Sequence, residues 1–270
     1  MCCFTGFVEF VANTKIFTRM ENAIQFLVYE MTFSSQEDLA MVLPIPVAAG
    51  AAENAVDFIS MEDSPEFFNL LDEMFPIEMG EAEAGDLAIL DEPVAASILE
   101  VHQVGCFEAS FVPQRKDFER LDTRFRLPDN VWDSCPGIAD YGFVVFKLKR
   151  GENQAVHPMA FSFPTRQPDK LFFPTVHIHD GEYHDRAEFD HGLYAQMPAG
   201  IKGWDKSEET VKQTQEGFPV EGWIQDLDFP GPERWDAVIR SNIVNRDQYC
   251  YRIKIEGQHN NTDIWAPLNP

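Results

Sequence analysis

Basic residues are nearly absent from the first 110 positions of the chain. Lys15 and Arg19 stand there against twenty aspartates and glutamates, so this stretch has a net charge of −18 (2 − 20). The other 160 residues contribute the remaining −6 of the total charge of −24. Such an acidic surface repels phosphate groups, which argues against a nucleic acid or an anionic membrane as a partner. A basic protein could dock on it or the surface could mimic DNA, and the alternative is a solvated acidic surface.

Long apolar runs, basic residues at the N-terminus and cysteines spaced as CxxC are also missing. No apolar run reaches the roughly 18 residues that a transmembrane helix needs, and the N-terminus has no basic region before its apolar residues. We therefore expect no secretory signal, no membrane segment and a cytoplasmic location. The cysteine count is odd and no two cysteines are spaced as CxxC, which argues against a disulfide framework. The five cysteines are Cys2, Cys3, Cys106, Cys135 and Cys250.

Composition and pattern together predict the fold class. Hydrophobic residues make up 44% of the 270 positions and aromatic residues 13%, enough for a sizeable core. Strand-like segments dominate, helix-like segments are inserted between them, and no regular β-α-β alternation appears. We expect an α+β, mainly β fold with antiparallel sheets. The loop-like stretch 131–139 is the candidate boundary between an acidic N-terminal half, 1–130, and a histidine-bearing C-terminal half, 131–270, although the two could form one compact domain.

Two stretches predict β-hairpins whose second strand ends in proline. Segments 25–33 and 39–47 form the first, and segments 141–149 and 157–164 form the second. Their similarity leaves open an internal duplication or two ordinary hairpins. Helices are predicted from Ser64, from Ser207 and over 232–242, because capping residues and prolines precede the apolar positions there.

Four of the seven histidines fall within residues 177–191. The apolar run 171–178 predicts a strand, and alternation along a strand places His177 and His179 on one face. Asp180 and Gly181 then predict a turn, after which more imidazole and carboxylate groups follow. Imidazole with carboxylate is a typical ligand set for a divalent transition metal such as zinc, iron or copper.

Two arrangements of this segment remain open. In one, His184 or Glu182 joins the strand pair after the turn. In the other, Asp185 begins a short helix that places His184, Glu188 and His191 on one face. We predict His177, His179, His184 and His191 as ligands, with Glu188 as a further ligand or a proton-shuttling carboxylate for a small-molecule substrate. The alternatives are a metal-free functional site and histidines that are merely hydrogen-bonded.

Cys2 suggests a different chemistry. Removal of Met1 would leave its thiol beside a free α-amine, which can act as the base for the nucleophile. The stretch Ile16-Phe-Thr-Arg-Met-Glu21 resembles the Phe-Gly-Arg-Asn-Met-Asp stretch of the choloylglycine-hydrolase and penicillin-acylase family. This resemblance implies an amidohydrolase with Cys2 as nucleophile and Arg19 in its site, although Glu21 replaces the aspartate. Cys2 and Cys3 could instead bind a soft metal such as Cu(I), alone or with the histidines.

The first 47 residues are also similar to an uncharacterised bacterial protein family. Its members have an early Cys-Gly-Phe segment, a stretch of the type Lys-Leu-Phe-Asn-Lys and a Leu-Val-Val-Pro-Val-Pro strand. The matching stretches here are 3–7, 15–19 and 41–46. The resemblance implies a relative in fold and carries no mechanism. The acidic charge of the N-terminal half suggests a third possible function, a non-catalytic interaction protein whose acidic half docks a basic partner.

Overall fold

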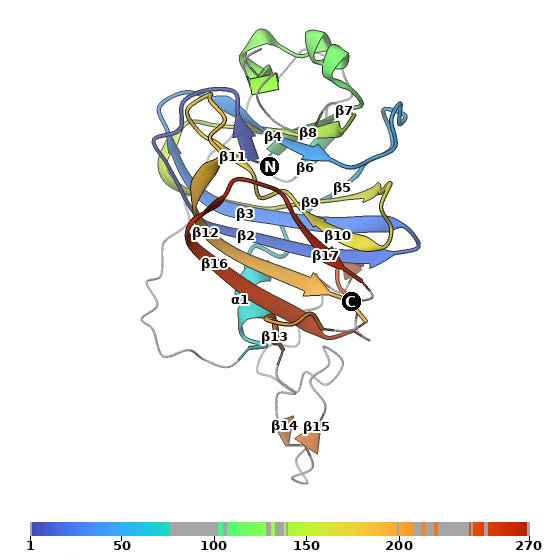
Figure 1. Cartoon of the computed structure of the whole chain (residues 1–270). Coiled ribbons are helices and arrows are strands. Elements are labelled where there is room, and N and C mark those ends of the chain that lie inside the picture. The colour runs from blue at the N-terminus through green and yellow to red at the C-terminus, as the bar shows by residue number, and fades with distance from the viewer. Residues whose placement is uncertain are drawn as a thin grey trace.

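Two β-sheets face each other and enclose the main core (Figure 1). The computed structural model describes residues 2–75, 102–104, 107–127, 131–132, 138, 140–198, 200–207, 212–213, 219–220, 238, 240–245 and 248–268. Strands dominate and helices are few, which confirms the prediction of a mainly β, α+β fold. In the part of the chain that is described, no helix is long and apolar enough to cross a bilayer.

Each sheet contains both antiparallel and parallel pairs of strands. Sheet A contains, in spatial order, β11 (His177–Ile178), β1 (Cys2–Phe4), β4 (Leu39–Ile45), β8 (Gly142–Leu148), β7 (Phe107–Val112) and β6 (His102–Val104). Sheet B contains β13 (Asp205–Lys206), β16 (Cys250–Asn260), β12 (Arg186–Gln196), β2 (Phe10–Glu21), β3 (Ile24–Ser35), β9 (Gly151–Pro164) and β5 (Asp57–Ile59). Most neighbours are antiparallel, but β1 pairs with β11, and β12 with β2, in parallel.

Short elements complete the described structure. Two ribbons pair β10 (Lys170–Phe173) with β17 (Ile264–Pro267), and β14 (Lys212–Gln213) with β15 (Pro219–Val220). The named helical elements are α1 (Phe67–Asp72) and the 3-10 helices η1 (Arg115–Arg120) and η2 (Thr123–Phe125). α1 covers the outer face of sheet B, whereas η1 lies against the outer face of sheet A.

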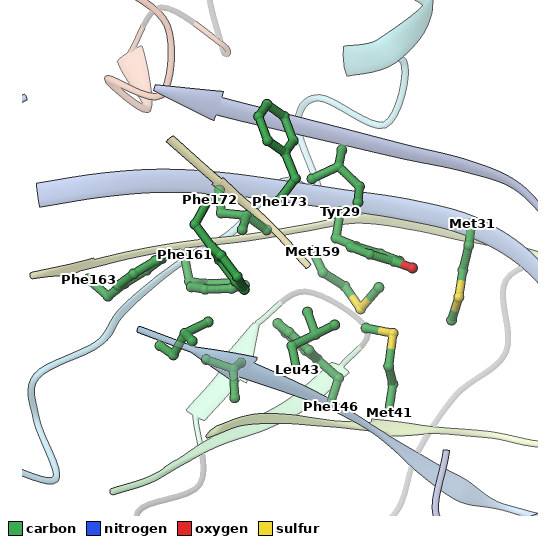
Figure 2. Packing of buried hydrophobic residues seen from close by; sticks show 14 of the residues in the cluster. Tyr29, Met31, Met41, Leu43, Phe146, Met159, Phe161, Phe163, Phe172 and Phe173 are labelled. Carbon is green, nitrogen blue, oxygen red and sulfur yellow. The ribbon is translucent and has the colours of Figure 1, made fainter. Parts of the chain in front are cut away.

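Apolar side chains form three layers because both faces of each sheet are covered. The largest cluster fills the space between the sheets, where Met41 and Phe146 of sheet A meet Met159 and Phe161 of sheet B (Figure 2). The other two clusters lie outside sheet B and outside sheet A. As a result all seven residues of β4 are buried, and the strand does not alternate between buried and exposed residues.

The two predicted hairpins are corners between the sheets. β3 belongs to sheet B and β4 to sheet A, while β8 belongs to sheet A and β9 to sheet B. The strands pair across the units instead, β3 with β9 and β4 with β8. The hairpin prediction is therefore wrong, because each strand pairs with a distant segment of the chain and not with the other strand of its predicted hairpin. The units cross between the sheets in opposite directions, so they are not arranged as copies of one hairpin.

Both sheets combine strands from the two halves of the chain. In sheet A, β1 lies between β11 and β4, and in sheet B, β2 lies between β12 and β3. Residues 1–130 and 131–270 therefore contribute strands to the same two sheets.

The remaining local predictions are met in part. The run 171–178 splits into β10 and β11, separated by Pro174. α1 begins at Phe67, and the Ser64 carbonyl accepts a hydrogen bond from the Phe67 N–H. Lys212–Gln213 form strand β14, so the helix predicted from Ser207 is wrong there. Residues 208–211 and 232–237 lie outside the described residues.

The turn between β2 and β3 gives a stability prediction. Asn22 and Ala23 have φ of 50° and 63°, the left-handed region that a two-residue type I′ turn requires. Since the alanine Cβ is crowded there, we expect Ala23→Gly to raise the free energy of unfolding by about 1 kcal/mol, measured by urea denaturation. Asn22→Gly should change it less, because asparagine tolerates this conformation. An Ala23→Gly variant no more stable than the wild type would contradict this.

Candidate functional site

Three of the four clustered histidines come together where the edge of sheet A faces sheet B. The ring centroids of His177 and His179 are 5.0 Å apart, and those of His177 and His191 are 4.6 Å apart. Phe189 packs on His177 at 4.8 Å and Phe4 on His179 at 5.5 Å. The strand alternation that places His177 and His179 on one face agrees with this contact.

His191 reaches the cluster from a strand of the other sheet. Arg186–Gln196 forms β12, so the predicted helix beginning at Asp185 is wrong. Along β12, Phe189 and His191 are buried, whereas Glu188 is exposed and accepts a hydrogen bond of 2.7 Å from Gln258 Nε2. The period of two places Glu188 on the opposite face of the strand from His191. The structure therefore does not bring Glu188 to the imidazoles.

His184 also lies apart from the three buried rings. It is exposed, and its Nε2 lies 2.8 Å from Asp180 Oδ2. This hydrogen bond to a carboxylate raises the pKa of His184. His157, a further candidate from the sequence, packs on Phe107 at 4.4 Å and also lies outside the cluster.

Burial keeps the three clustered imidazoles neutral. Loss of hydration, with smaller effects of His191 and His179, lowers the pKa of His177 to about 2. Burial likewise lowers the pKa of His179 to about 4 and that of His191 to about 3. A neutral imidazole has one N–H donor and one nitrogen lone pair, and only the lone pair can bind a metal.

Two ring nitrogens of the cluster lack a hydrogen-bond partner within the described residues. His177 Nδ1 lies 3.2 Å from His179 Nε2, and His191 Nδ1 accepts the Asp190 N–H at 3.2 Å. The Nε2 atoms of His177 and His191 are buried and unpaired. Leaving a buried polar atom unpaired costs about 1–3 kcal/mol, so two such atoms in one cluster need an explanation.

The backbone of His177 is held on both edges. On one edge Cys2 pairs with it in the parallel β1–β11 register. On the other, the buried side chain of Asn261 accepts the His177 N–H at 2.8 Å and donates to the His177 carbonyl at 2.9 Å. Sequence reasoning missed Asn261. Its only signal is the polar, turn-forming run Asn260-Asn-Thr-Asp263 before the last strand.

Arg19 has a structural role away from this cluster. It is buried in β2 and donates to the carbonyls of Asn242 and Ile243. Thr14 is the β2 residue paired with His191. Arg19 is five residues further along, roughly 17 Å at about 3.4 Å per residue. The structure therefore does not bring Arg19 to the site of Cys2 and the histidines.

The described residues do not contain a complete set of metal ligands. No group of three or more histidine, cysteine, aspartate or glutamate side chains among them could hold a metal ion. The side chain of Cys2 lies outside what the structure describes, as do Cys106 and Cys135.

A second polar cluster ties α1 to sheet B. Asp72 accepts hydrogen bonds from the Tyr194 hydroxyl at 2.5 Å, from Lys15 Nζ at 3.2 Å and from Arg252 Nη1 at 3.3 Å. Glu30 lies opposite Lys15 in the β2–β3 register. Burial, opposed by Lys15 and reinforced by Asp72, raises the pKa of Glu30 to about 7.

No protein-family model matches the chain. The chain is similar to the crystal structure of baculovirus P35, with 12% identity, 99% of both chains covered and a TM-score of 0.49. A mutated baculovirus P35 after caspase cleavage has 11% identity over 95% of this chain and 99% of that one, with a TM-score of 0.44. The P35 of a caspase-8 complex has 12% identity over 96% and 97%, with a TM-score of 0.43. A likeness at these values assigns neither a family nor an activity.

Glu30 makes stability depend on pH. The folded protein keeps the Glu30 proton up to about pH 7, whereas an unfolded chain releases it near the ordinary pKa of 4.5. Unfolding between these values releases a proton, so this residue's contribution to stability falls as the pH rises from 4.5 to 7. We expect Glu30→Gln to remove that loss and to be more stable than the wild type near pH 8, by roughly 3 kcal/mol at most.

Urea denaturation between pH 4 and pH 8 measures this effect, with Glu256→Gln, an exposed strand glutamate, as the matched control. Wild type and Glu30→Gln should be about equally stable near pH 4. A stability difference that stays constant across the range would contradict the assignment.

Proposed function

We propose that this protein binds one transition-metal ion between His177 and His191. The proposal rests on two buried, unpaired Nε2 atoms in one cluster of neutral imidazoles. A bound cation would supply a partner for His177 Nε2, and for His191 Nε2 once the proton of that ring has moved to Nδ1. Imidazole nitrogen is a preferred ligand of zinc, copper and iron, which are the candidate metals.

The third histidine has a supporting role in this proposal. If His177 carries its proton on Nδ1 and donates it to His179 Nε2, the lone pair on His177 Nε2 is free for a metal. His179 then fixes the tautomer and orientation of His177, as partners of ligating histidines commonly do. His191 requires a change, because its Nδ1 accepts the Asp190 N–H and its proton therefore lies on Nε2. Metal binding has to move that proton to Nδ1 and give up this hydrogen bond.

Cys2 is the proposed third ligand. Its backbone pairs with that of His177 in adjacent strands of sheet A. A thiolate with two imidazoles is a set that suits copper or zinc and leaves a coordination position open for a small molecule. We place the protein in the cytoplasm, where a thiol stays reduced.

Metal content tests the proposal directly. Protein purified without a histidine tag and loaded with zinc should hold about one ion per chain by elemental analysis. The double variant His177→Ala/His191→Ala should lose this ion, because it removes both unpaired nitrogens. The matched control is His184→Ala, an exposed histidine of the same segment that lies outside the cluster, and it should retain the ion.

Circular dichroism establishes that each variant is folded before its metal is counted. A folded double variant with wild-type zinc content would place the ion elsewhere. A wild-type protein that binds neither zinc, copper nor iron would end the proposal.

A second candidate is an N-terminal-cysteine amidohydrolase. The backbone pairing of Cys2 with His177 favours it, because a base that reached the thiol would activate the nucleophile. The low pKa of His177 makes its imidazole a weak base, so the α-amine freed by removal of Met1 would have to take the proton. Arg19 is left out of this proposal, since it donates to the carbonyls of Asn242 and Ile243, which lie outside the sheets.

Intact-mass measurement separates this second candidate from the first. An amidohydrolase should have lost Met1 and should carry an acyl adduct on Cys2 after incubation with activated amides. A metal chelator should change neither result. A retained Met1 would exclude it, because the α-amine would then be displaced from the thiol. The Cys2→Ala variant is the control for adducts on other residues.

The docking of a basic partner on the acidic half stays a prediction. Residues 2–75 hold twelve acidic side chains against Lys15 and Arg19. Both basic residues are already paired, with Asp72 and Glu21 respectively. Binding of this kind would weaken steeply as salt is added.

A further inference from the structure

The side chain of Asn261 is fully engaged with the backbone of the histidine segment. It lies in the turn between β16 and β17, and only 1% of it is exposed. Its Oδ1 accepts the His177 N–H, and its Nδ2 donates to the carbonyls of His177 and His184, both at 2.9 Å. The Tyr183 hydroxyl in turn donates to the Asn261 carbonyl at 3.0 Å.

This amide takes the place of a missing neighbouring strand. In an antiparallel ladder, two paired residues exchange an N–H···O bond in each direction. Asn261 makes the same exchange with His177 through its side chain, on the edge of β11 opposite β1. Asp263 extends the contact, because its Oδ1 accepts the N–H groups of Thr175 and Val176. β11 has only two residues, so its position depends on these contacts.

We infer that Asn261 is the positioning residue of the metal site, holding the His177 peptide so that its ring meets His179 and His191. This inference rests on the proposed metal-binding function. The direction of His177 Nε2 is set by its backbone, and that backbone is fixed by one pairing with β1 and one with Asn261. Without Asn261, His177 would still be buried, but its ring would no longer be held against the other two.

Another buried amide provides the structural comparison. Gln25, also buried, accepts the Phe172 N–H at 3.0 Å through Oε1 and donates to the Phe172 carbonyl at 2.7 Å through Nε2. The contact is the same in kind, but it holds β10 and involves no histidine. A variant of Gln25 therefore reports the effect on stability alone.

The test compares Asn261→Asp with Gln25→Glu and with Asn260→Asp. The first two put a carboxylate against a backbone carbonyl, and the third makes the same change at an exposed neighbour. Cobalt(II), a spectroscopic substitute for zinc, is titrated into each folded protein. We expect Asn261→Asp to bind cobalt about ten- to a hundredfold more weakly and to shift its visible absorption bands. Gln25→Glu should lower the melting temperature but keep the wild-type affinity and spectrum. Asn260→Asp should leave the melting temperature, the affinity and the spectrum unchanged.

A second measurement does not depend on metal. Nitrogen-15 NMR of the apoprotein reports the tautomers of His177 and His179 and the hydrogen bond between them. We expect Asn261→Asp to change these signals, and Gln25→Glu to leave them as in the wild type. If Asn261→Asp does not fold, Tyr183→Phe loosens the same contact more mildly, and it should change the His177 signals in the same direction.

The outcomes separate the two proposals. A wild-type protein that binds no cobalt, zinc, copper or iron overturns the proposed function, and the NMR comparison then decides the role of Asn261 by itself. Wild-type affinity, spectrum and tautomers in folded Asn261→Asp or Tyr183→Phe would overturn the positioning role. Equal losses of affinity in Asn261→Asp and Gln25→Glu would also overturn it, because the effect would then be one of general stability.

Discussion

The desolvation of three imidazoles at the meeting point of the two sheets is the constraint on which the proposed site depends. Phe4 and Phe189 already line this place, and a further apolar side chain would fill it without any unpaired atom. Histidine here leaves two buried nitrogens without partners among the described residues. Each costs about 1–3 kcal/mol, a large part of the stability of an ordinary protein. A metal ion bound to both nitrogens would offset this cost, after the proton of His191 has moved from Nε2 to Nδ1.

Buried side-chain amides supply the precision that short strands lack. Gln25 holds β10, Gln196 holds the backbone of Asn245, and Asn261 holds β11. Each of the three both donates to and accepts from a backbone group. Apolar contacts in the surrounding core have little directionality and could tolerate small shifts of these segments. An amide with two hydrogen bonds to the backbone would lose them on such a shift, so these residues can set the geometry of a site.

The mainly β fold could be predicted from the sequence because strand composition is a local signal. The contact between His177 and His179 also follows from local alternation. The strand from Arg186 to Gln196 also has a local signal, because every second residue from Phe189 to Ala195 is apolar or a histidine. However, the spacing of His184, Glu188 and His191 fits one face of a helix equally well. Short runs of this kind do not separate a helix from a strand.

Other features depend on contacts between distant segments. Whether two successive strands form a hairpin or a corner depends on which sheet accepts the second strand, as β3 and β4 illustrate. The pairing of Cys2 with His177, and the bonds from Asn261 to a residue 84 positions earlier, likewise have no local signal.

X-ray absorption at the edge of the bound metal identifies the ligand atoms around the ion and so tests the proposed site. We expect two imidazole nitrogens and one sulfur in the first coordination shell of the zinc- or copper-loaded protein. We also expect the sulfur to disappear in Cys2→Ala and an imidazole to disappear in His177→Ala. A shell of oxygen ligands alone, or one unchanged by either substitution, would contradict the proposal.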